Sequence, residues 1–382
     1  MKNLTRFLKA SAAGCILAAS ILSAEAGPSV LVDANTGAVL AQEDAFDRWY
    51  PASLTKLMTA YVAFRAIQQG EVTLASPVRI SAKATQEPPS KMGYPAGTVL
   101  TLDTALKIIM VKSANDVATA IGESLAGSQA AWAERMNREA KRIGMTGSNF
   151  VNAHGLHNDL QYTTAHDLAV LALAIRAEYP QYASYFTIEA LGAGADVIEN
   201  HNTLIGRFNG ADGMKTGYTC PAGYNLVASA TRDGRTMLAV VIGATSVATR
   251  ADKAADLLAQ GFSLPPAQGP KLWELPTPAD AALEAVNLRQ TVCTQAAAKE
   301  RLAALDEKGR LVFHSAHLTG GELPTPRVTP ISLGGATGPA SPFLPEIERP
   351  AMIGNIPVPL PRPDYTPEAS ASAQAPSDGV TQ

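Results

Sequence analysis

The chain has 382 residues, of which 46% are hydrophobic and 17% charged, and its formal net charge is −3. This balance is typical of a globular protein with a sizeable core. The negative charge argues against nucleic acid as the main partner, because neutralising phosphates requires a basic surface. Aromatic residues make up only 6%, too few for a base-stacking platform. Beyond the N-terminus, no apolar run approaches the ~20 residues that a membrane-spanning helix needs.

The first 26 residues have the pattern of a secretory signal peptide. A basic region, an apolar stretch and a small-x-small cleavage site follow one another, at Lys2, Arg6 and Lys9, at 10–22, and at Ala24-Glu25-Ala26. A buried N-terminal helix is the alternative, and it fits these flanks less well. The pattern therefore predicts export, to the periplasm or another part of the cell envelope, with residues 1–26 removed.

The body of the chain, 27–262, begins and ends with strand patterns and carries helical patterns between them. Two hairpins are predicted around turns that contain glycine, at 29–33 with 38–42 and at 225–231 with 236–243. Helices are predicted at 102–110, 167–177 and 250–260. Strand pairs at both ends predict an α+β fold, in which the two ends form one antiparallel sheet and a helical insertion lies between.

The first motif that points to chemistry is S-x-x-K, at Ser53 and Lys56. Residues three apart on a helix share one face. A serine hydroxyl becomes a good nucleophile when a base takes its proton, and a lysine kept neutral by burial and nearby cations is such a base. Alone the motif is weak, because serine and lysine at this spacing are common on surface helices.

Two later motifs supply complementary groups. Ser113 and Asn115 form an S-x-N motif between helical segments, where the hydroxyl can relay a proton and the amide can orient substrate. Lys215, Thr216 and Gly217 form a K-T-G motif. Lysine and threonine together can bind a carboxylate, and glycine lets a substrate backbone approach closely. Each has a plain alternative, a polar helix junction or an exposed turn.

Taken together, the ordered triplet resembles that of penicillin-binding proteins and β-lactamases. The chain resembles the serine D-Ala-D-Ala carboxypeptidases, the low-molecular-mass penicillin-binding proteins, over about 29–262. Besides the triplet, the resemblance rests on the flanking sequences 51–59, 152–156, 212–219 and 222–230. It implies an antiparallel sheet flanked by helices plus a mainly helical lobe, the penicillin-binding transpeptidase/β-lactamase-like fold, with Ser53 in the cleft between.

The resemblance also implies a function and a role for each motif residue. The substrates would be peptidoglycan stem peptides ending in D-Ala-D-Ala, β-lactam antibiotics would be covalent inhibitors, and we expect no cofactor and no metal. The implied catalytic residues are the nucleophile Ser53, the general base Lys56 and the proton shuttle Ser113. The implied substrate-binding residues are Asn115, Lys215, Thr216, Gly217 and Arg250.

Three alternatives remain open at this point. A β-lactamase needs a carboxylate that activates water, and the comparable stretch, 148–156, contains no Asp or Glu. A metallopeptidase site can be drawn from His154 and His157 with Asp159 or His166. A non-catalytic wall-binding scaffold with the same fold is the third, although all three motifs are intact.

The C-terminal third differs from the body, because residues 263–382 hold 18 of the 26 prolines. We predict a partly ordered extension over 263–323, with a helix at 294–308 and a short strand at 311–314. From 324 to 382 the composition predicts disorder and no catalytic contribution. Many relatives carry a C-terminal β-domain and an amphipathic anchor helix, but 368–382 shows no apolar face, so no membrane anchor is expected.

Cysteine is the last constraint. Removal of the predicted signal peptide takes away Cys15 and leaves Cys220 and Cys293. Exported proteins can keep disulfides, so the pair either forms a bridge or remains as two separate thiols. A bridge would fasten the extension beside the K-T-G motif. Sequence does not provide the distance that decides between these two states.

Overall fold

The computed structural model describes residues 27–266, 269–344, 352–353 and 356–357. The predicted signal peptide lies outside the described residues. The chain divides into two compact units between Pro345 and Glu346. In the second unit, β11 (Met352–Ile353) and β12 (Ile356–Pro357) pair antiparallel.

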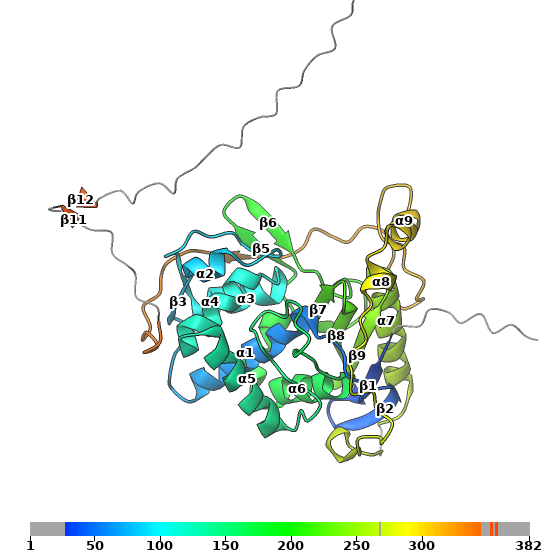
Figure 1. The fold of residues 1–382 in the computed structure, drawn as a ribbon. Helices are drawn as coiled ribbons and strands as arrows, with labels where there is room; N and C mark the ends of the chain where they lie inside the picture. The colour runs from blue at the N-terminus through cyan, green and yellow to red at the C-terminus, as the bar shows by residue number, and fades with distance from the viewer. Residues whose placement is uncertain (1–26, 267–268, 345–351, 354–355, 358–382) are drawn as a thin grey trace, which may run out of the picture. The chain divides into compact units, whose positions relative to one another are not determined.

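The main sheet is built from both ends of the body (Figure 1). Its strands are β1 (Ser29–Asp33), β2 (Ala38–Glu43), β7 (Ala211–Thr219), β8 (Gly223–Arg232) and β9 (Arg235–Ala244). They lie in the order β2-β1-β9-β8-β7, and all neighbours are antiparallel. The predicted antiparallel sheet is therefore confirmed, and β7 is left at its edge.

Helices cover both faces of this sheet. On one face, α7 (Val247–Ser263) packs on β8 and β9, in a cluster that includes Leu31, Ala239 and Val241. On the other face, α6 (Ala165–Glu178) packs in the cluster that contains the neighbouring residue Val240. Successive side chains of a strand point to opposite faces, which explains why residues adjacent in sequence enter different clusters.

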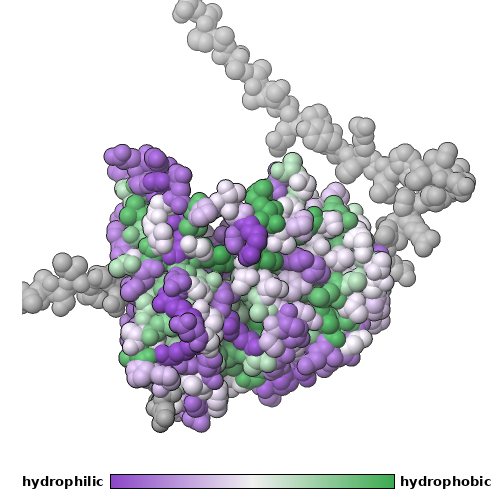
Figure 2. Space-filling model, turned by 180° about the vertical axis from the view of Figure 1, so that it is seen from behind, coloured by the Kyte–Doolittle hydropathy of each residue, from purple (hydrophilic) through white to green (hydrophobic). Residues whose placement is uncertain are grey.

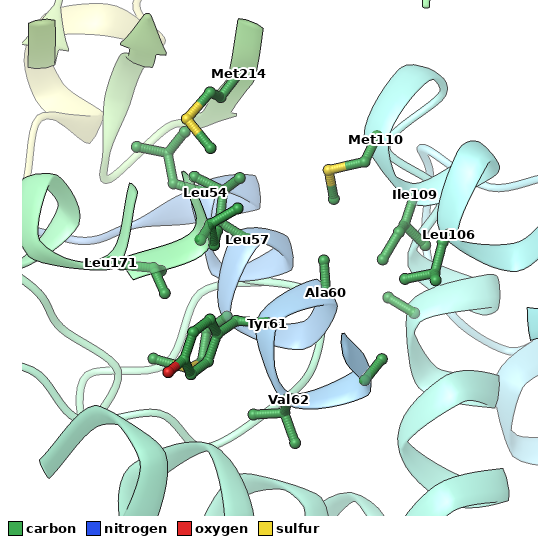
Figure 3. Packing of buried hydrophobic residues seen from close by; sticks show 14 of the residues in the cluster. Leu54, Leu57, Ala60, Tyr61, Val62, Leu106, Ile109, Met110, Leu171 and Met214 are labelled. Carbon is green, nitrogen blue, oxygen red and sulfur yellow. The ribbon is translucent and has the colours of Figure 1, made fainter. Parts of the chain in front are cut away.

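The helical lobe surrounds one buried helix, α1 (Thr55–Gln68), of which 11 residues are buried. A helix that is buried on all sides shows little amphipathic pattern. Figure 3 shows Ala60 of α1 on the side of Leu106 and Ile109, and Leu57 on the other side of the helix, beside Leu54. The remaining helices and strands of the lobe are α2 (Ala82–Thr85), α3 (Leu102–Val111), α4 (Asn115–Ala126), α5 (Gln129–Ile143), β3 (Pro77–Arg79) and β4 (Val99–Thr101).

Short helical turns and a hairpin outside the main sheet join these layers. Two 3₁₀ turns lie in the body, η1 (Ala52–Leu54) before α1 and η2 (Pro180–Phe186) after α6. The hairpin of β5 (Ala190–Ala193) and β6 (Asp196–Glu199) leads into a loop that returns the chain to β7. Among the described residues, no helix combines the length and apolar character needed to cross a membrane.

The extension contains η3 (Leu272–Glu274), α8 (Arg289–Val292) and α9 (Gln295–Ala303). The helix predicted to run to residue 308 is shorter, since α9 ends at Ala303. The predicted strand at 311–314 is wrong, because Leu311 forms only an isolated bridge with Leu305. Helix α9 has no buried residue, and the surface seen from behind in Figure 2 has a hydrophilic projection at its upper left. Because α9 buries no apolar face, its sequence lacks the hydrophobic periodicity that would have located its end.

Part of the range predicted to be disordered is ordered against the body. Strand β10 (Val328–Ile331) pairs in parallel with β5. Further along, the Gly338 amide donates to the Ala75 carbonyl at 3.0 Å, and Ser76 Oγ donates to the Pro339 carbonyl at 2.6 Å. In each of these bonds the C-terminal segment contributes backbone groups, which a prediction from side-chain composition does not consider.

Two truncations test what this segment contributes. A chain ending at Leu344 keeps β10 and the contacts at Gly338, so we expect the melting temperature and activity of the full chain. A chain ending at Gly321 loses them, and we expect its melting temperature to fall by several degrees, because the edge of β5 becomes unpaired. Differential scanning fluorimetry on both chains measures this. Equal melting temperatures would show that β10 adds nothing to stability.

Candidate active site

Ser53 lies in a turn held tightly from two sides. It belongs to η1, directly before α1, and the preceding Ala52 has a φ of 47°, in the left-handed region. A Cβ on Gly155 would lie 1.8 Å from the Ala52 carbonyl oxygen, and one on Gly217 would lie 3.0 Å from the Ser53 nitrogen. Gly155, whose φ is 90°, leaves no room for a side chain, and a side chain at Gly217 would press on the nucleophile turn. This explains the glycine of the K-T-G motif.

Lys56 reaches Ser53 from the first turn of α1. Its Nζ lies 3.1 Å from Ser53 Oγ, and it donates to Asn115 Oδ1 at 2.8 Å and to the His154 carbonyl at 2.7 Å. A neutral amine has two N–H groups and one lone pair. The Asn115 oxygen and the His154 carbonyl only accept, so they use both N–H groups and leave the lone pair for the Ser53 hydroxyl.

The surroundings of Lys56 favour this neutral form. Burial, followed by the positive charge of Lys215, holds the pKa of Lys56 well below its ordinary value. The side chain is fully buried. The contact with Ser53 and the lowered pKa are the properties that a base acting on Ser53 would need.

The S-x-N motif occupies the break between α3 and α4. Ser113 has a φ of 62°, which interrupts the helical path, and Asn115 starts α4. Asn115 Nδ2 donates to the Pro88 carbonyl at 2.9 Å, so its oxygen is turned toward Lys56. The break thus places a hydroxyl and an amide oxygen in the same cavity as Ser53.

Lys215 links the edge strand β7 to the helical lobe. Its Nζ donates to Ser113 Oγ and to the Thr216 carbonyl, each at 3.0 Å. Burial, followed by the charge of Arg250, lowers the pKa of Lys215 to about 7. Near neutral pH this side chain therefore changes its charge.

Arg250 belongs to α7, which packs on β8, and it contributes to the same site. It is 4% exposed and donates a long hydrogen bond of 3.4 Å to the Asn225 carbonyl, and its buried Nε has no hydrogen-bond partner among the described residues. Within the described part of the chain, neither Lys215 nor Arg250 forms an ion pair with a carboxylate. Buried cations without counterions are costly, so the site is prepared for an anionic group.

A cavity of about 630 Å³ unites these residues. Of the eight residues expected at the site, six line it: Ser53, Ser113, Asn115, Thr216, Gly217 and Arg250. The other two, Lys56 and Lys215, reach it through their bonds to Ser53 and Ser113. The structure therefore brings together all eight of these candidate residues.

The cavity has further walls that the motifs did not reveal. They come from the loop after β6, from the end of β7 and from the start of β8. They include His201, Thr203, Tyr218, Thr219 and Tyr224. Tyr218 directly follows the K-T-G motif and shares a strand face with Thr216, so the period of two could have identified it. His201 and Tyr224 carry no such local signal.

The histidines of the alternative zinc site have separate partners. His154 Nε2 lies 3.4 Å from Glu87, His157 lies 3.3 Å from Asp159, and His166 contacts Asp167 and the Leu272 carbonyl. In the part of the chain that the structure describes, no three potential metal ligands converge.

A family model described as D-alanyl-D-alanine carboxypeptidase matches residues 16–246. D-alanyl-D-alanine carboxypeptidase DacC of Escherichia coli is 36% identical over 247 residues, covering 63% of this chain and 62% of the relative. DacF of Bacillus subtilis is 32% identical and covers 64% of each chain. The chain therefore spans less than two thirds of the length of these curated relatives.

Solved structures are similar over the same region. Penicillin binding protein 5 from Haemophilus influenzae superposes with a TM-score of 0.60 at 33% identity, covering 62% of this chain and 71% of that chain. The cefotaxime-bound form of penicillin-binding protein D2 from Listeria monocytogenes has a TM-score of 0.57 at 26% identity, covering 62% and 97%. The expected fold is confirmed.

Proposed function

Since the chain belongs to the D-alanyl-D-alanine carboxypeptidase family, we propose that it removes the terminal D-Ala of peptidoglycan stem peptides through an acyl-enzyme at Ser53. One observation carries the proposal. The Ser53–Lys56 pair lies in the same cavity as a cationic site, formed by Lys215 and Arg250, that contains no counterion among the described residues. Such a site suits a peptide whose free carboxylate lies next to the scissile bond.

In the acylation step, Ser53 Oγ attacks the carbonyl carbon of the D-Ala-D-Ala bond. Its proton passes to the neutral amine of Lys56, and Asn115 and the His154 carbonyl hold that amine in place. When the C–N bond breaks, the departing amine takes the proton that Lys56 accepted, relayed by the Ser113 hydroxyl, and Lys56 becomes neutral again. Water then hydrolyses the ester, which releases the shortened peptide and restores the Ser53 hydroxyl.

Substrate binding is assigned to the opposite wall. Lys215, Thr216 and Arg250 would hold the terminal carboxylate, and Gly217 allows the substrate backbone to pass close to Ser53. A charge-assisted hydrogen bond to a desolvated carboxylate contributes more than a neutral one. The position of the carboxylate would select the carboxypeptidase over the endopeptidase reaction.

The direct test uses intact-mass and product analysis. The purified chain is incubated with a pentapeptide ending in D-Ala-D-Ala, and mass spectrometry follows the loss of one alanine. Product from the wild type and none from Ser53→Ala is the expected result. Peptide that remains intact with both proteins would contradict the proposed activity and favour a wall-binding scaffold.

β-Lactams are the proposed inhibitors, since their ring opens by the same acylation. The Listeria relative was solved in its cefotaxime-bound form. We expect a stable penicilloyl adduct on Ser53 and little turnover of nitrocefin. Sustained turnover would favour the β-lactamase alternative.

Export to the periplasm or cell envelope is part of the proposal. Cys220 and Cys293 form a disulfide, which supports it, since such bonds persist in oxidising compartments. Fractionation of cells that produce the full chain tests the location, with the oxidised form expected outside the cytoplasm.

Lys215→Ala is expected to weaken binding of substrates with a free C-terminus. Losing a charge-assisted hydrogen bond costs about 1.5–3 kcal/mol, or roughly one to two decades in kcat/KM. The measurement compares peptides with a free and an amidated C-terminus. If both lose equally, Lys215 acts through Ser113 and not through the carboxylate.

The dependence of kcat/KM on pH should show the ionisation of both Lys56 and Lys215. Neutral Lys56 is the active base, so kcat/KM rises as Lys56 loses its proton. Charged Lys215 binds the carboxylate, so kcat/KM falls as pH increases through the Lys215 pKa of about 7. Acylation rates between about pH 5 and pH 10 reveal both limbs. In Lys215→Arg the falling limb should move to higher pH, and an unchanged limb would show that another group titrates.

A further inference from the structure

The far end of the K-T-G strand carries an aromatic pair. Tyr218 of β7 lies opposite Tyr224 of β8, and their rings stack with centroids 4.3 Å apart. Both residues line the active-site cavity, and Tyr218 remains 42% exposed. The pair, here called the aromatic wall, therefore has apolar surface available to a ligand.

The order of residues along β7 gives this wall a place in substrate binding. Gly217 lies against the Ser53 backbone, so the reacting carbonyl must be near it. Thr216 and Lys215, on one side, are assigned to the carboxylate of the leaving group. Tyr218 is on the other side, about 7 Å along the strand from Thr216. The acyl part of the substrate therefore extends toward the aromatic wall.

The aromatic wall is held by the extension. Cys220 and Cys293 form a disulfide, with Cα atoms 5.6 Å apart, so the question that the sequence left open is answered by a bridge. The Tyr218 hydroxyl lies 3.1 Å from Cys293 Sγ. Arg301 of α9 lies 5.9 Å from the centre of the Tyr224 ring, the geometry of a cation–π contact.

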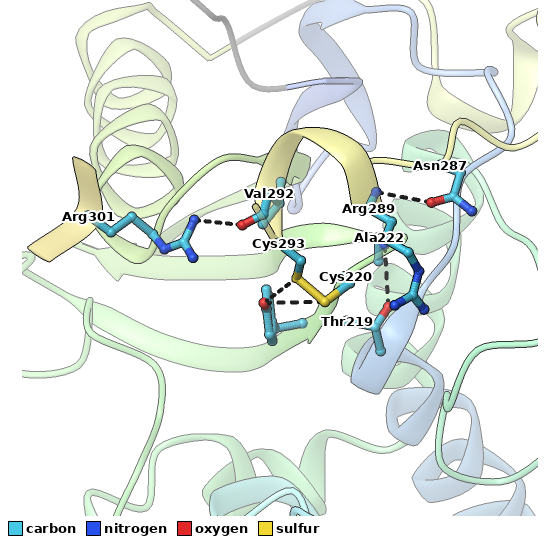
Figure 4. The surroundings of a disulfide bond; sticks show 9 residues. Thr219, Cys220, Ala222, Asn287, Arg289, Val292, Cys293 and Arg301 are labelled. Atoms are coloured by element: carbon cyan, nitrogen blue, oxygen red, sulfur yellow. Dashed lines mark hydrogen bonds between the residues drawn. A yellow bond between two sulfur atoms is a disulfide. The ribbon is translucent and has the colours of Figure 1, made fainter. Parts of the chain in front are cut away.

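Backbone contacts complete the attachment. Arg301 donates to the Val292 carbonyl at 2.8 Å, which ties α9 to α8 beside the bridge (Figure 4). The Leu288 amide donates to the Pro221 carbonyl at 2.9 Å. Segment 288–301 is therefore attached to the turn between β7 and β8 by the disulfide and by the Leu288–Pro221 hydrogen bond, and Arg301 contacts Tyr224 at the start of β8. The segment lies beyond the family match, which ends at residue 246.

We propose that the disulfide-tethered segment 288–301 is a specificity element of the active site, which positions the aromatic wall to bind an apolar or aromatic group on the acyl side of the ligand. The inference rests on the proposed acylation of Ser53. It adds a segment outside the matched family region to the substrate-binding surface, and it makes ligand preference depend on the Cys220–Cys293 bridge.

Two penicillins that differ in one ring test the proposal. Benzylpenicillin carries a phenyl group on its acylamino side chain, and 6-acetamidopenicillanic acid has the same amide with no ring. Second-order acylation constants of both are measured by intact-mass spectrometry, and their ratio defines the aryl preference. We expect Cys220→Ser/Cys293→Ser to lower this preference about three- to tenfold, the effect of one aromatic contact, with the acetamido constant unchanged.

Matched variants separate the ring from the fold. Tyr218→Ala should lower the aryl preference and Tyr218→Phe should keep it. Arg310→Gln is the control on the same extension, because Arg310 pairs with Asp306 at 2.7 Å and Glu322 at 3.2 Å. We expect the wild-type preference in this variant.

Reduction of the wild type provides a second test that does not depend on folding of a variant. Dithiothreitol converts the bridge to two thiols and becomes its own cyclic disulfide, and the aryl preference should fall as in the double variant. An unchanged preference in both cases would overturn the proposal, as would an equal fall of both constants. If the wild type is acylated by neither penicillin, the proposed function itself fails.

Discussion

Replacing Ser53 by alanine is expected to abolish both penicilloyl labelling and release of D-Ala. The Ser53 hydroxyl is the group that Lys56 Nζ contacts at 3.1 Å, and without its oxygen no ester can form. The fold should persist, because the change removes one partly exposed oxygen. Intact-mass spectrometry after incubation with benzylpenicillin measures the adduct.

A second serine of the cavity makes a suitable control. Ser90 lines the same cavity and donates to the Lys112 carbonyl at 3.0 Å. Ser90→Ala should be labelled like the wild type. A labelled Ser53→Ala protein would show that another residue is the nucleophile, and peptide mapping of the adduct would identify it.

Replacing Lys56 by glutamine is expected to slow acylation by about two to four decades, the usual contribution of a general base. Glutamine can still donate to the Asn115 oxygen and to the His154 carbonyl, which Lys56 now bonds at 2.8 Å and 2.7 Å, but it has no basic lone pair. The variant therefore separates proton transfer from support of the cleft. The second-order acylation constant and the melting temperature are measured on the same sample.

The pH dependence of this variant adds an independent check. The rising limb assigned to Lys56 should disappear from Lys56→Gln, while the falling limb near pH 7 assigned to Lys215 should remain. An acylation rate within tenfold of the wild type, with both limbs retained, would show that a different base serves Ser53.

The sequence by itself located the motifs of the candidate site and predicted the sheet. The motifs at Ser53, Ser113 and Lys215 are short, and each lies at a break or edge that local rules describe. Hairpins with glycine turns at both ends of the body predicted the antiparallel sheet, since strands closed by a tight turn pair with their neighbours. Periodicity located α3, α6 and α7 because each packs one face or more on a core.

Only the tertiary structure decided what depends on distant partners. Local sequence does not distinguish Arg250 from other arginines on helices. The packing of α7 on the sheet buries Arg250 and places it in the wall of the cavity. The Cys220–Cys293 bridge spans 73 residues, and spacing along the chain carries no information about that distance. Strand β10 has a proline-containing sequence typical of a linker, yet β5 provides backbone partners for it. Local patterns record which face a residue buries, whereas contacts between segments far apart depend on how the layers pack, and that packing places Tyr224, His201 and the extension around Ser53.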